Sequence, residues 1–512
     1  MRVLRGSVGG WAASAFLFLS ACGGGGAGGG DGGGGTPGPD PATVLTPKAS
    51  FSTDDVGHLL QRTRFGVTPA DLSAVQQQGV PSFVDSMLVF TPGSQVETDA
   101  TASEILDTEF PEPHELARWW LRVMQETPNP FQEELALFWH DHFATSQEIL
   151  GSDKRYWYPD HLDLFRHGGA GNLRQLLYNV AQDWTILEWL DGVRSSKGTP
   201  NENFAREFWE LFTLGVDNGY TQTDIEQAAR CFTGFRTRFD DATDKSFITF
   251  DPTRHDTGNK SLLGTTVMGR SGADAQNEYR DMVDVTLANR PVAEYICRRL
   301  FEYFVYPNAP QSVVDELAAL LRASSYELAP VLATMFKSEA FYSPAAKAGI
   351  AKNPVEFALG FVRSTGLHTH MDDLDNAVTN AGQRPTMPPN VNGWVSGSLW
   401  FGSQAVVERG NFARTCVTHR NTDAQTGLDL RALLPQGATT TAAATVDALA
   451  ALLRVRLTPA DVTALTAYLN TQRQSNGTVV DSPFDASVDT QIDERVRGLL
   501  YILAQHPTYQ VR

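Results

Sequence analysis

The sequence predicts a mainly α protein, in which one large domain of many helices carries a short β-hairpin or loop insertion. Apolar residues recur at helical spacing over most of the chain from Phe51 onward. Many of these stretches follow helix-start signals, in which a capping residue precedes a proline or an acidic residue three positions later. The least helical stretch, 247–267, contains short strand-like patterns.

The chain begins with a pattern typical of bacterial export signals. Arg2 and Arg5 precede an apolar run at 11–19, and the sequence LSAC, which resembles a lipobox, ends at Cys22. The apolar run is too short to be a permanent membrane span. We therefore expect residues 1–21 to be a signal peptide and Cys22 to be lipidated. An ordinary secretory signal with an incidental cysteine is the alternative.

Residues 22–50 are rich in glycine, which indicates a flexible tether that cannot form a core. The residue after Cys22 is Gly23 rather than an aspartate, a feature that resembles lipoproteins of the outer membrane in Gram-negative cells. These features predict a protein of the bacterial cell envelope, attached to a membrane through its lipid.

The composition of the chain argues against several classes of protein. The formal net charge is −18, and it becomes −20 once the two arginines of the signal are removed. An acidic chain is repelled by phosphate backbones, so we expect no nucleic-acid partner. Hydrophobic residues make up 42% of the sequence, enough for a large core. Cys231, Cys297 and Cys416 are widely spaced, which supports neither a disulfide framework nor a cysteine-based zinc site.

We expect residues 51–420 to form the main helical domain, because no linker is visible in most of this stretch, although length alone would suggest two or three domains. A stretch rich in threonine and alanine, 439–445, marks a weak boundary. Two short helices and a helix at 492–504 are expected after it. Residues 421–512 are therefore expected to be a helical extension packed on the main domain.

The stretch 200–215, PNENFAREFWELFTLG, combines a strong helix signal with an unusual number of polar groups. Pro200 and Asn201 supply the start signal, and Gly215 supplies the end. An apolar stripe of helical period must face a core, and it comprises Phe204, Phe208, Leu211 and Phe212.

The opposite face of this helix carries polar and charged groups. At about 100° per residue, Asn203, Glu207 and Glu210 lie within roughly 60° of one another. Arg206 lies four residues from both Glu202 and Glu210, the spacing of helix ion pairs. The face is either solvated, or it lines a pocket in which Glu207 and Glu210 hold a metal or exchange protons.

A second helix, starting at Pro130, ends in the sequence FWHDHF. His140 and His142 are two residues apart and therefore point about 200° apart on a helix. Both can reach one metal ion only if the helix ends between them, near Asp141. Otherwise His142 is a core imidazole bonded to a carbonyl or carboxylate, and His140 is a helix-end cation that suits the helix dipole.

Two further segments supply candidate residues. Residues 247–250 and 262–267 are expected to pair as a hairpin around His255 and Asp256. In such a loop these two side chains could be an acid/base pair or metal ligands, or form an ordinary turn. Trp394, in the rigid sequence PPNVNGW, either lines a pocket or locks the end of the domain.

These motifs together resemble a large bacterial family catalogued as domain of unknown function 1800. The similarity runs from about His58 to Arg409 in ordered blocks, which include HLL at 58–60, FWHDHF at 138–143, PNENFARE at 200–207, FTG at 232–234, HD at 255–256 and GW at 393–394. Gly192 stands where the family often has asparagine, and Trp184-Thr185 where it often has Pro-Ala. The resemblance implies an exported, mostly helical protein, often encoded beside another exported family, numbered 1501, which is therefore an expected partner. It supplies no reaction, cofactor or substrate.

Two hypotheses for function follow. In the first, which we favour, the protein is a non-catalytic scaffold or binding protein with a buried network of His, Glu and Asp groups that satisfy one another. In the second, it is a metal-assisted hydrolase. Its divalent metal would be bound by His140, His142, Glu207 and His255. Its catalytic groups would be His140, Glu207, Glu210, His255 and Asp256, and its pocket would include Asn201, Asn203, Arg206 and Trp394. Convergence on one open point would favour the hydrolase, whereas closed pairwise contacts would favour the scaffold.

Overall fold

The computed structural model describes residues 45–91, 112–347, 349–367, 369–418, 428–434 and 440–512, all of which belong to one compact unit. The expected signal peptide, the lipidated Cys22 and most of the tether lie outside these residues. The segment 45–50, which we expected within the tether, contacts the helical unit. Pro47 forms an antiparallel bridge with Ser338, and the amide of Lys48 donates to the carbonyl of Lys337 at 2.8 Å.

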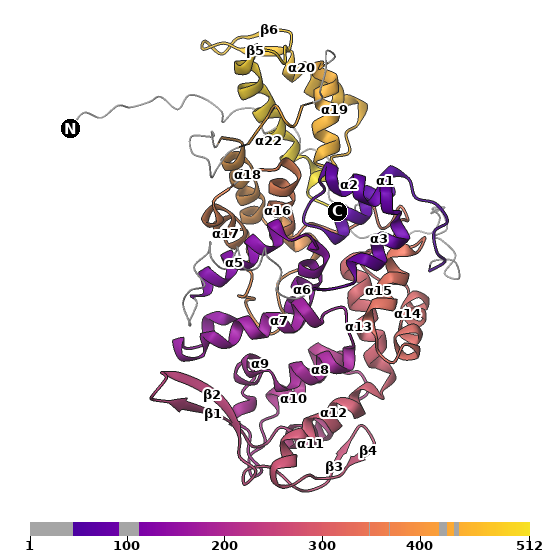
Figure 1. The fold of residues 1–512 in the computed structure, drawn as a ribbon, viewed down its shortest axis with the longest axis vertical. Coiled ribbons are helices and arrows are strands. Elements are labelled where there is room, and N and C mark those ends of the chain that lie inside the picture. The colour runs from indigo at the N-terminus through magenta and orange to yellow at the C-terminus, as the bar shows by residue number, and fades with distance from the viewer. Residues whose placement is uncertain (1–44, 92–111, 348, 368, 419–427, 435–439) are drawn as a thin grey trace, which may run out of the picture. The chain divides into compact units, whose positions relative to one another are not determined.

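Helices form most of the described structure (Figure 1), which confirms the mainly α prediction. The first half of the chain contains α1 (Thr53–Thr63), α2 (Pro69–Gln78), α3 (Val80–Met87), α5 (Pro113–Glu126), α6 (Pro130–His142), α7 (Tyr158–Gly168), α8 (Leu173–Gln182), α9 (Trp184–Trp189), α10 (Asn203–Glu207) and α11 (Gln222–Cys231). The second half contains α12 (Glu278–Leu287), α13 (Arg290–Phe304), α14 (Gln311–Ala323), α15 (Leu328–Lys337), α16 (Pro354–Thr365), α17 (Met371–Asn380), α18 (Ser403–Thr418), α19 (Ala442–Leu452), α20 (Pro459–Leu469), α21 (Asp489–Gln491) and α22 (Arg497–Gln505).

Strands occur, within the described part of the chain, in three two-stranded antiparallel sheets. The pairs are β1 (Phe235–Asp240) with β2 (Lys245–Phe250), β3 (Lys260–Leu262) with β4 (Thr265–Val267), and β5 (Thr471–Arg473) with β6 (Val479–Asp481). The expected hairpin between 247–250 and 262–267 is therefore wrong. Each strand pairs with its nearer neighbour, because closing a shorter loop loses less chain entropy. His255 and Asp256 consequently lie between two hairpins.

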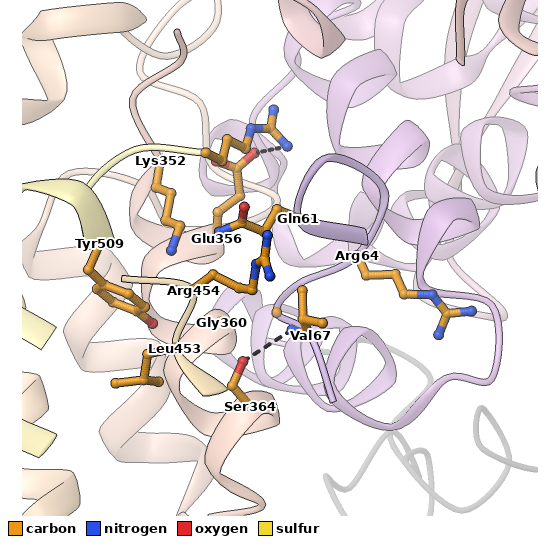
Figure 2. A pocket seen from close by; sticks show the side chains of 12 residues that line it. Gln61, Arg64, Val67, Lys352, Glu356, Gly360, Ser364, Leu453, Arg454 and Tyr509 are labelled. Carbon is orange, nitrogen blue, oxygen red and sulfur yellow. Dashed lines mark hydrogen bonds and ion pairs between the residues drawn. The ribbon is translucent and has the colours of Figure 1, made fainter. Parts of the chain in front are cut away.

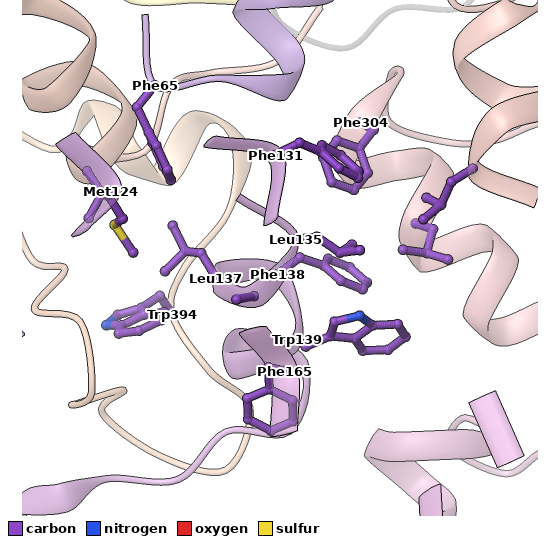
Figure 3. Close-up of a cluster of buried hydrophobic side chains, with 14 of the residues drawn as sticks. Phe65, Met124, Phe131, Leu135, Leu137, Phe138, Trp139, Phe165, Phe304 and Trp394 are labelled. Carbon is purple, nitrogen blue, oxygen red and sulfur yellow. The ribbon is translucent and has the colours of Figure 1, made fainter. Parts of the chain in front are cut away.

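Helix α6 lies at the centre of the core. Every residue of this helix except Asp141 is buried, which is typical of a helix enclosed on all sides. It contacts α1, α5 and α7, and α5, α6 and α7 lie one below the other in Figure 1. Figure 3 shows Phe138 of α6 among apolar side chains that include Phe304 and Trp394. Polar groups on α6 are thus removed from water and need partners within the protein.

The C-terminal segments contact the helices that precede them. Helix α18 contacts α16, α17 and α22, and α19 contacts α20 and α22. The hydroxyl of Tyr509 donates to the carbonyl of Phe357 in α16 at 3.2 Å. Arg454, just after α19, pairs with Asp54 of α1 at 2.8 Å. The last segments of the chain therefore close on its first helix.

Candidate functional site

His140 is fully buried near the end of α6. Its Nε2 accepts a hydrogen bond from the amide of Thr386 at 3.1 Å, and its Nδ1 has no hydrogen-bond partner among the described residues. The ring centre lies 5.5 Å from that of Trp120 and 5.4 Å from that of Trp394. Burial, together with the nearby His161, holds the pKa of His140 well below its ordinary value. The imidazole is therefore neutral. This environment does not favour the alternative in which His140 is a protonated cation at the helix end.

His142 points to a different part of the core. Its Nε2 donates to the carbonyl of Phe212 at 2.9 Å, and its ring stacks on Phe138 with centroids 5.9 Å apart. Burial lowers the pKa of His142 to about 3, and Arg299 adds to the fall. Helix α6 continues through His142 without a break at Asp141. The condition for one metal ion shared by His140 and His142 is therefore not met.

Asp141, between these histidines, is a site residue that the sequence analysis did not single out. Its Oδ1 accepts a hydrogen bond from the amide of Trp394 at 2.7 Å. Gly393 has φ +77°, and a Cβ at this position would collide with Asp141. Burial raises the pKa of Asp141 to about 6. The glycine thus allows the PPNVNGW loop to approach α6 closely, which places the Trp394 ring against His140.

A buried ion pair also joins α6 to α7, and its carboxylate, Glu133, lies about two helical turns before His140. Glu133 accepts from Arg166 Nε and Nη2, each at 2.9 Å, and from Trp120 Nε1 at 2.7 Å. Both charged side chains are 1% exposed. This two-pronged contact satisfies the carboxylate with three donors, which is what a buried charge requires.

His255 lies in a closed cluster. Its Nδ1 donates to the carbonyl of Thr233 at 2.8 Å, and its Nε2 contacts Glu278 Oε2 at 3.0 Å. Lys260 pairs with the other oxygen of Glu278, and all three of these charged or imidazole side chains are buried. Burial alone would raise the pKa of Glu278, but hydrogen bonds from His255 and Lys260 hold it below the ordinary value.

Asp256, next to His255, points to another partner. It forms a two-pronged pair with Arg230, with Nε–Oδ2 at 2.8 Å and Nη2–Oδ1 at 2.9 Å. The hydrogen bond from Arg230 lowers the pKa of Asp256. Partial burial opposes this effect, but the pKa stays below its ordinary value. His255 and Asp256 therefore belong to two separate contacts rather than to one acid/base pair.

Sequence reasoning missed Glu278 and Lys260, although one signal was present. In β3 the side chains of Lys260 and Leu262 are buried and that of Ser261 between them is exposed. A lysine at an inward-facing strand position indicates a buried carboxylate elsewhere. The identity of that carboxylate, on a later helix, could not be read from the strand itself.

The central stretch 200–215 forms α10 followed by a π-helix, Phe208–Thr213. Phe204, Phe208 and Phe212 are buried, and Leu211 is half-buried. The carbonyl of Trp209 accepts from both Leu214 and Gly215. We expected a regular α-helix here. Because a π-helix has more residues per turn, the side chains after Glu207 point in directions that differ from those expected for an α-helix. Such π turns occur frequently at functional sites.

The polar face of this stretch contains the expected ladder. Arg206 pairs with Glu202 at 3.0 Å and with Glu210 at 3.2 Å. The Oδ1 of Asn201 accepts from the amide of Asn203 at 2.9 Å, and the Nδ2 of Asn203 donates to the carbonyl of Leu190 at 3.2 Å.

Glu207 differs from its neighbours on this face. Within the described part of the chain its carboxylate has no hydrogen bond or ion pair with another residue. Burial raises the pKa of Glu207, Glu210 adds to the rise, and Arg206 opposes it. Of the carboxylates described on this face, Glu207 is thus the one without a hydrogen bond or ion pair, since Glu202 and Glu210 each pair with Arg206.

The candidate residues divide into separate environments. His140 contacts Trp394, and Arg206 contacts Glu210, whereas His142 and His255 are each bonded to other groups. Among the described residues, no group of three or more His, Cys, Asp and Glu side chains is arranged to hold a metal ion. A divalent metal and the catalytic roles stay predictions. Nor, in this part of the chain, is any helix both long and apolar enough to cross a membrane.

Fold and site together define a mainly α protein whose core contains closed pairs of buried polar groups, among them Glu133 with Arg166 and Glu278 with Lys260. The chain belongs to the family described as protein of unknown function (DUF1800), whose model matches residues 58–511. The match extends beyond the motif blocks and includes the C-terminal helices. No curated protein and no solved structure matches the chain. Membership of this family assigns no activity.

Proposed function

We propose that this protein is a non-catalytic scaffold or binding protein. The observation that supports this proposal most strongly is the closure of His255, whose two ring nitrogens contact the carbonyl of Thr233 and the carboxylate of Glu278. A general base or a metal ligand needs a free lone pair facing substrate or metal. A side chain whose hydrogen-bonding capacity is used internally instead contributes to the rigidity of the fold.

We further propose that the protein is exported and attached to the bacterial cell envelope, on the outer membrane, through a lipid on Cys22. The support is the sequence LSAC after an apolar run and the glycine-rich tether that follows. The lipid would make the membrane its first partner. An exported protein of family 1501 is proposed as a second partner, from the family resemblance alone.

The alternative, a metal-assisted hydrolase, is favoured by two side chains. The Nδ1–H of His140 is a buried donor without a partner among the described residues, since Nε2 accepts from Thr386, and Glu207 is a half-buried carboxylate whose pKa is raised. Side chains with unused hydrogen-bonding capacity or perturbed pKa values occur often at active sites. These two residues therefore deserve the direct test.

Metal content and stability together separate the two functions. We would measure the metal stoichiometry of the purified, untagged protein, and the unfolding midpoints of His140→Ala and Glu207→Gln. The scaffold proposal expects no stoichiometric metal and a cost of roughly 1–3 kcal/mol for His140→Ala, because the amide of Thr386 loses its acceptor. The exposed His114 and Glu226 provide matched controls, His114→Ala and Glu226→Gln. Bound metal that is lost from either site variant without loss of stability would contradict the scaffold proposal.

A further inference from the structure

Two adjoining cavities lie between α1, the start of α16 and the segments that follow α19. The inner cavity has a volume of about 20 Å³, and the residues that line it include Gln61, Arg64, Lys352, Glu356, Arg454 and Arg512. The outer cavity has a volume of about 120 Å³, and its lining includes Asp54, His58, Gln61, Lys347, Arg454 and Arg456. The inner cavity holds about one water molecule, whereas the outer one is large enough for a small ligand. Gln61 and Arg454 line both.

Lys352 places a buried amine at the inner cavity. The side chain is 6% exposed, and within the described residues its amine forms no hydrogen bond or ion pair. It lies 3.7 Å from the ring centre of Tyr509. The main chain holds it there, since its amide donates to Gln510 and its carbonyl accepts from Arg409. Figure 2 shows the amine directed into the space that Arg454 and Gln61 also enter.

The charges around the inner cavity do not balance. Four buried cationic side chains lie in this region: Arg62, Lys352, Arg409 and Arg512. The buried carboxylates are Glu134 and Glu356, which Arg512 contacts at 2.6 and 2.8 Å. Burial raises the pKa of Glu134 well above its ordinary value, Arg512 opposes the rise, and Glu356 adds to it. Two carboxylates therefore face four cationic side chains, and burial lowers the pKa of one of these, Lys352, to about 7. Because uncompensated buried charge is unfavourable, the region favours an added anion.

The outer cavity continues this positive region toward solvent. Lys347 pairs with Asp54 and with Asp55, each at 2.7 Å, and Arg454 pairs with Asp54 at 2.8 Å. Arg456 is exposed, and its side chain has no hydrogen bond or ion pair within the described residues. The Arg454 guanidinium packs against Gly57, where a Cβ would collide with it. Gly57 therefore leaves the room that this guanidinium needs.

We propose that the outer cavity binds a phosphate group, with Arg454 and Gln61 as direct donors and Lys352 as a compensating charge behind them. A guanidinium presents paired N–H groups that fit phosphate oxygens. A phosphate monoester carries about −1.5 to −2 charges at neutral pH. It therefore balances a positive surplus larger than one charge better than a carboxylate, which carries a single negative charge. None of these residues belongs to the His255 cluster, so the inference goes beyond the scaffold proposal and does not depend on it.

The first test measures the thermal unfolding midpoint of the full protein during titration with inorganic phosphate at constant ionic strength. A ligand that binds only the folded state raises the midpoint. We expect phosphate to raise it in a saturable manner, and sodium acetate to leave it unchanged. The absence of a phosphate effect, or an equal effect of acetate, would overturn the proposal.

Variants locate the site. Arg454→Gln should weaken phosphate binding about ten- to a hundredfold, because a hydrogen bond to a charged group is lost. Lys352→Met should weaken it as well, yet raise the midpoint in phosphate-free buffer, since a buried amine without an ion pair is replaced by an apolar chain. Gly57→Ala displaces Arg454 without removing its charge and should also weaken binding. Arg414→Gln, an exposed arginine on α18, should respond like the unaltered protein.

Comparison of ligands identifies the source of the phosphate group. Glycerol 3-phosphate and vesicles of phosphatidylglycerol in phosphatidylcholine are compared with inorganic phosphate in the unaltered protein and in Arg454→Gln. Of the ligands whose binding depends on Arg454, the one that binds most tightly names the source as free phosphate, a small ester or a lipid headgroup. Equal responses of the unaltered protein, Arg454→Gln and Lys352→Met would overturn the proposal.

Discussion

Replacement of Glu278 by glutamine removes one charge from the cluster with His255 and Lys260 while preserving the size of the side chain. Lys260 is 1% exposed, and within the described residues Glu278 is its ion-pair partner. The variant therefore leaves a buried ammonium without its carboxylate, and removal of one partner of a buried pair costs about 3–5 kcal/mol. The new amide also brings N–H donors toward groups that already donate.

A double-mutant cycle separates this pair from the rest of the core. Lys260→Met removes the ammonium and leaves Glu278 with His255 and the amide of Arg270, at 3.0 and 2.9 Å. The double variant Glu278→Gln, Lys260→Met has no stranded charge, so we expect it to be more stable than Glu278→Gln alone. Coupling energies of about 0.5–3 kcal/mol are typical of residues in direct contact.

Urea unfolding followed by far-UV circular dichroism at neutral pH measures these differences. Glu202→Gln, on the half-exposed ladder with Arg206, is the matched control and should cost less than about 1 kcal/mol. Salt should reduce the control effect more than the Glu278 effect, because buried pairs are weakly screened. Equal costs for the two glutamine variants would refute the reasoning that the His255 cluster is buried and closed.

Acid unfolding offers an independent check on the same residue. The pKa of Glu278 lies below its ordinary value in the folded protein. The stabilisation is thus complete above the pKa of an unfolded glutamate and is lost as the pH falls through the lower folded-state pKa. Glu278→Gln should make the acid-side fall of the unfolding free energy shallower.

Three further predictions concern other parts of the chain. Cys22→Ser should move the protein from the membrane to the soluble fraction, because acyl chains contribute about 0.8 kcal/mol per buried methylene; unchanged fractionation would contradict lipid attachment. Phe208→Ala should cost about 3–5 kcal/mol in thermal or urea unfolding, since the ring is fully buried; a cost below about 1 kcal/mol would place the ring outside the core. Asp141→Asn should stabilise the protein by about 1–3 kcal/mol above pH 6 and by little below pH 4. The reason is that burial raises the folded-state pKa of Asp141 to about 6, so the wild-type carboxyl group loses stability as the pH rises from 4 to 6. A constant stability difference over this range would show that Asp141 does not titrate there.

The features that follow from local spacing were predictable from the sequence. The apolar stripe of 200–215 required only a period near 3.6, and Phe204, Phe208 and Phe212 are buried as that period indicates. The ladder of Arg206 with Glu202 and Glu210 follows from the separation of four residues.

The partners of the histidines were not predictable, because they lie far away in sequence. His140 is bonded to the amide of Thr386, and His255 to Glu278 on a later helix. No local pattern specifies such tertiary contacts. The π-helix at 208–213 was also missed, since an expectation of 100° per residue contains no information about where a wider turn begins.

Helix α1 is held by residues that lie hundreds of positions later in the chain. His58 contacts the carbonyl of Phe341 at 2.9 Å, and Asp54 pairs with Lys347 and Arg454 at 2.7 and 2.8 Å. Contacts of such sequence separation require long loops to close and form slowly. Of the described helices, α1 is therefore made first yet is expected to reach its native surroundings late. In a protein exported as we propose, this delay would keep the leading part of the chain able to pass through a translocation pore while its C-terminal half is still being made.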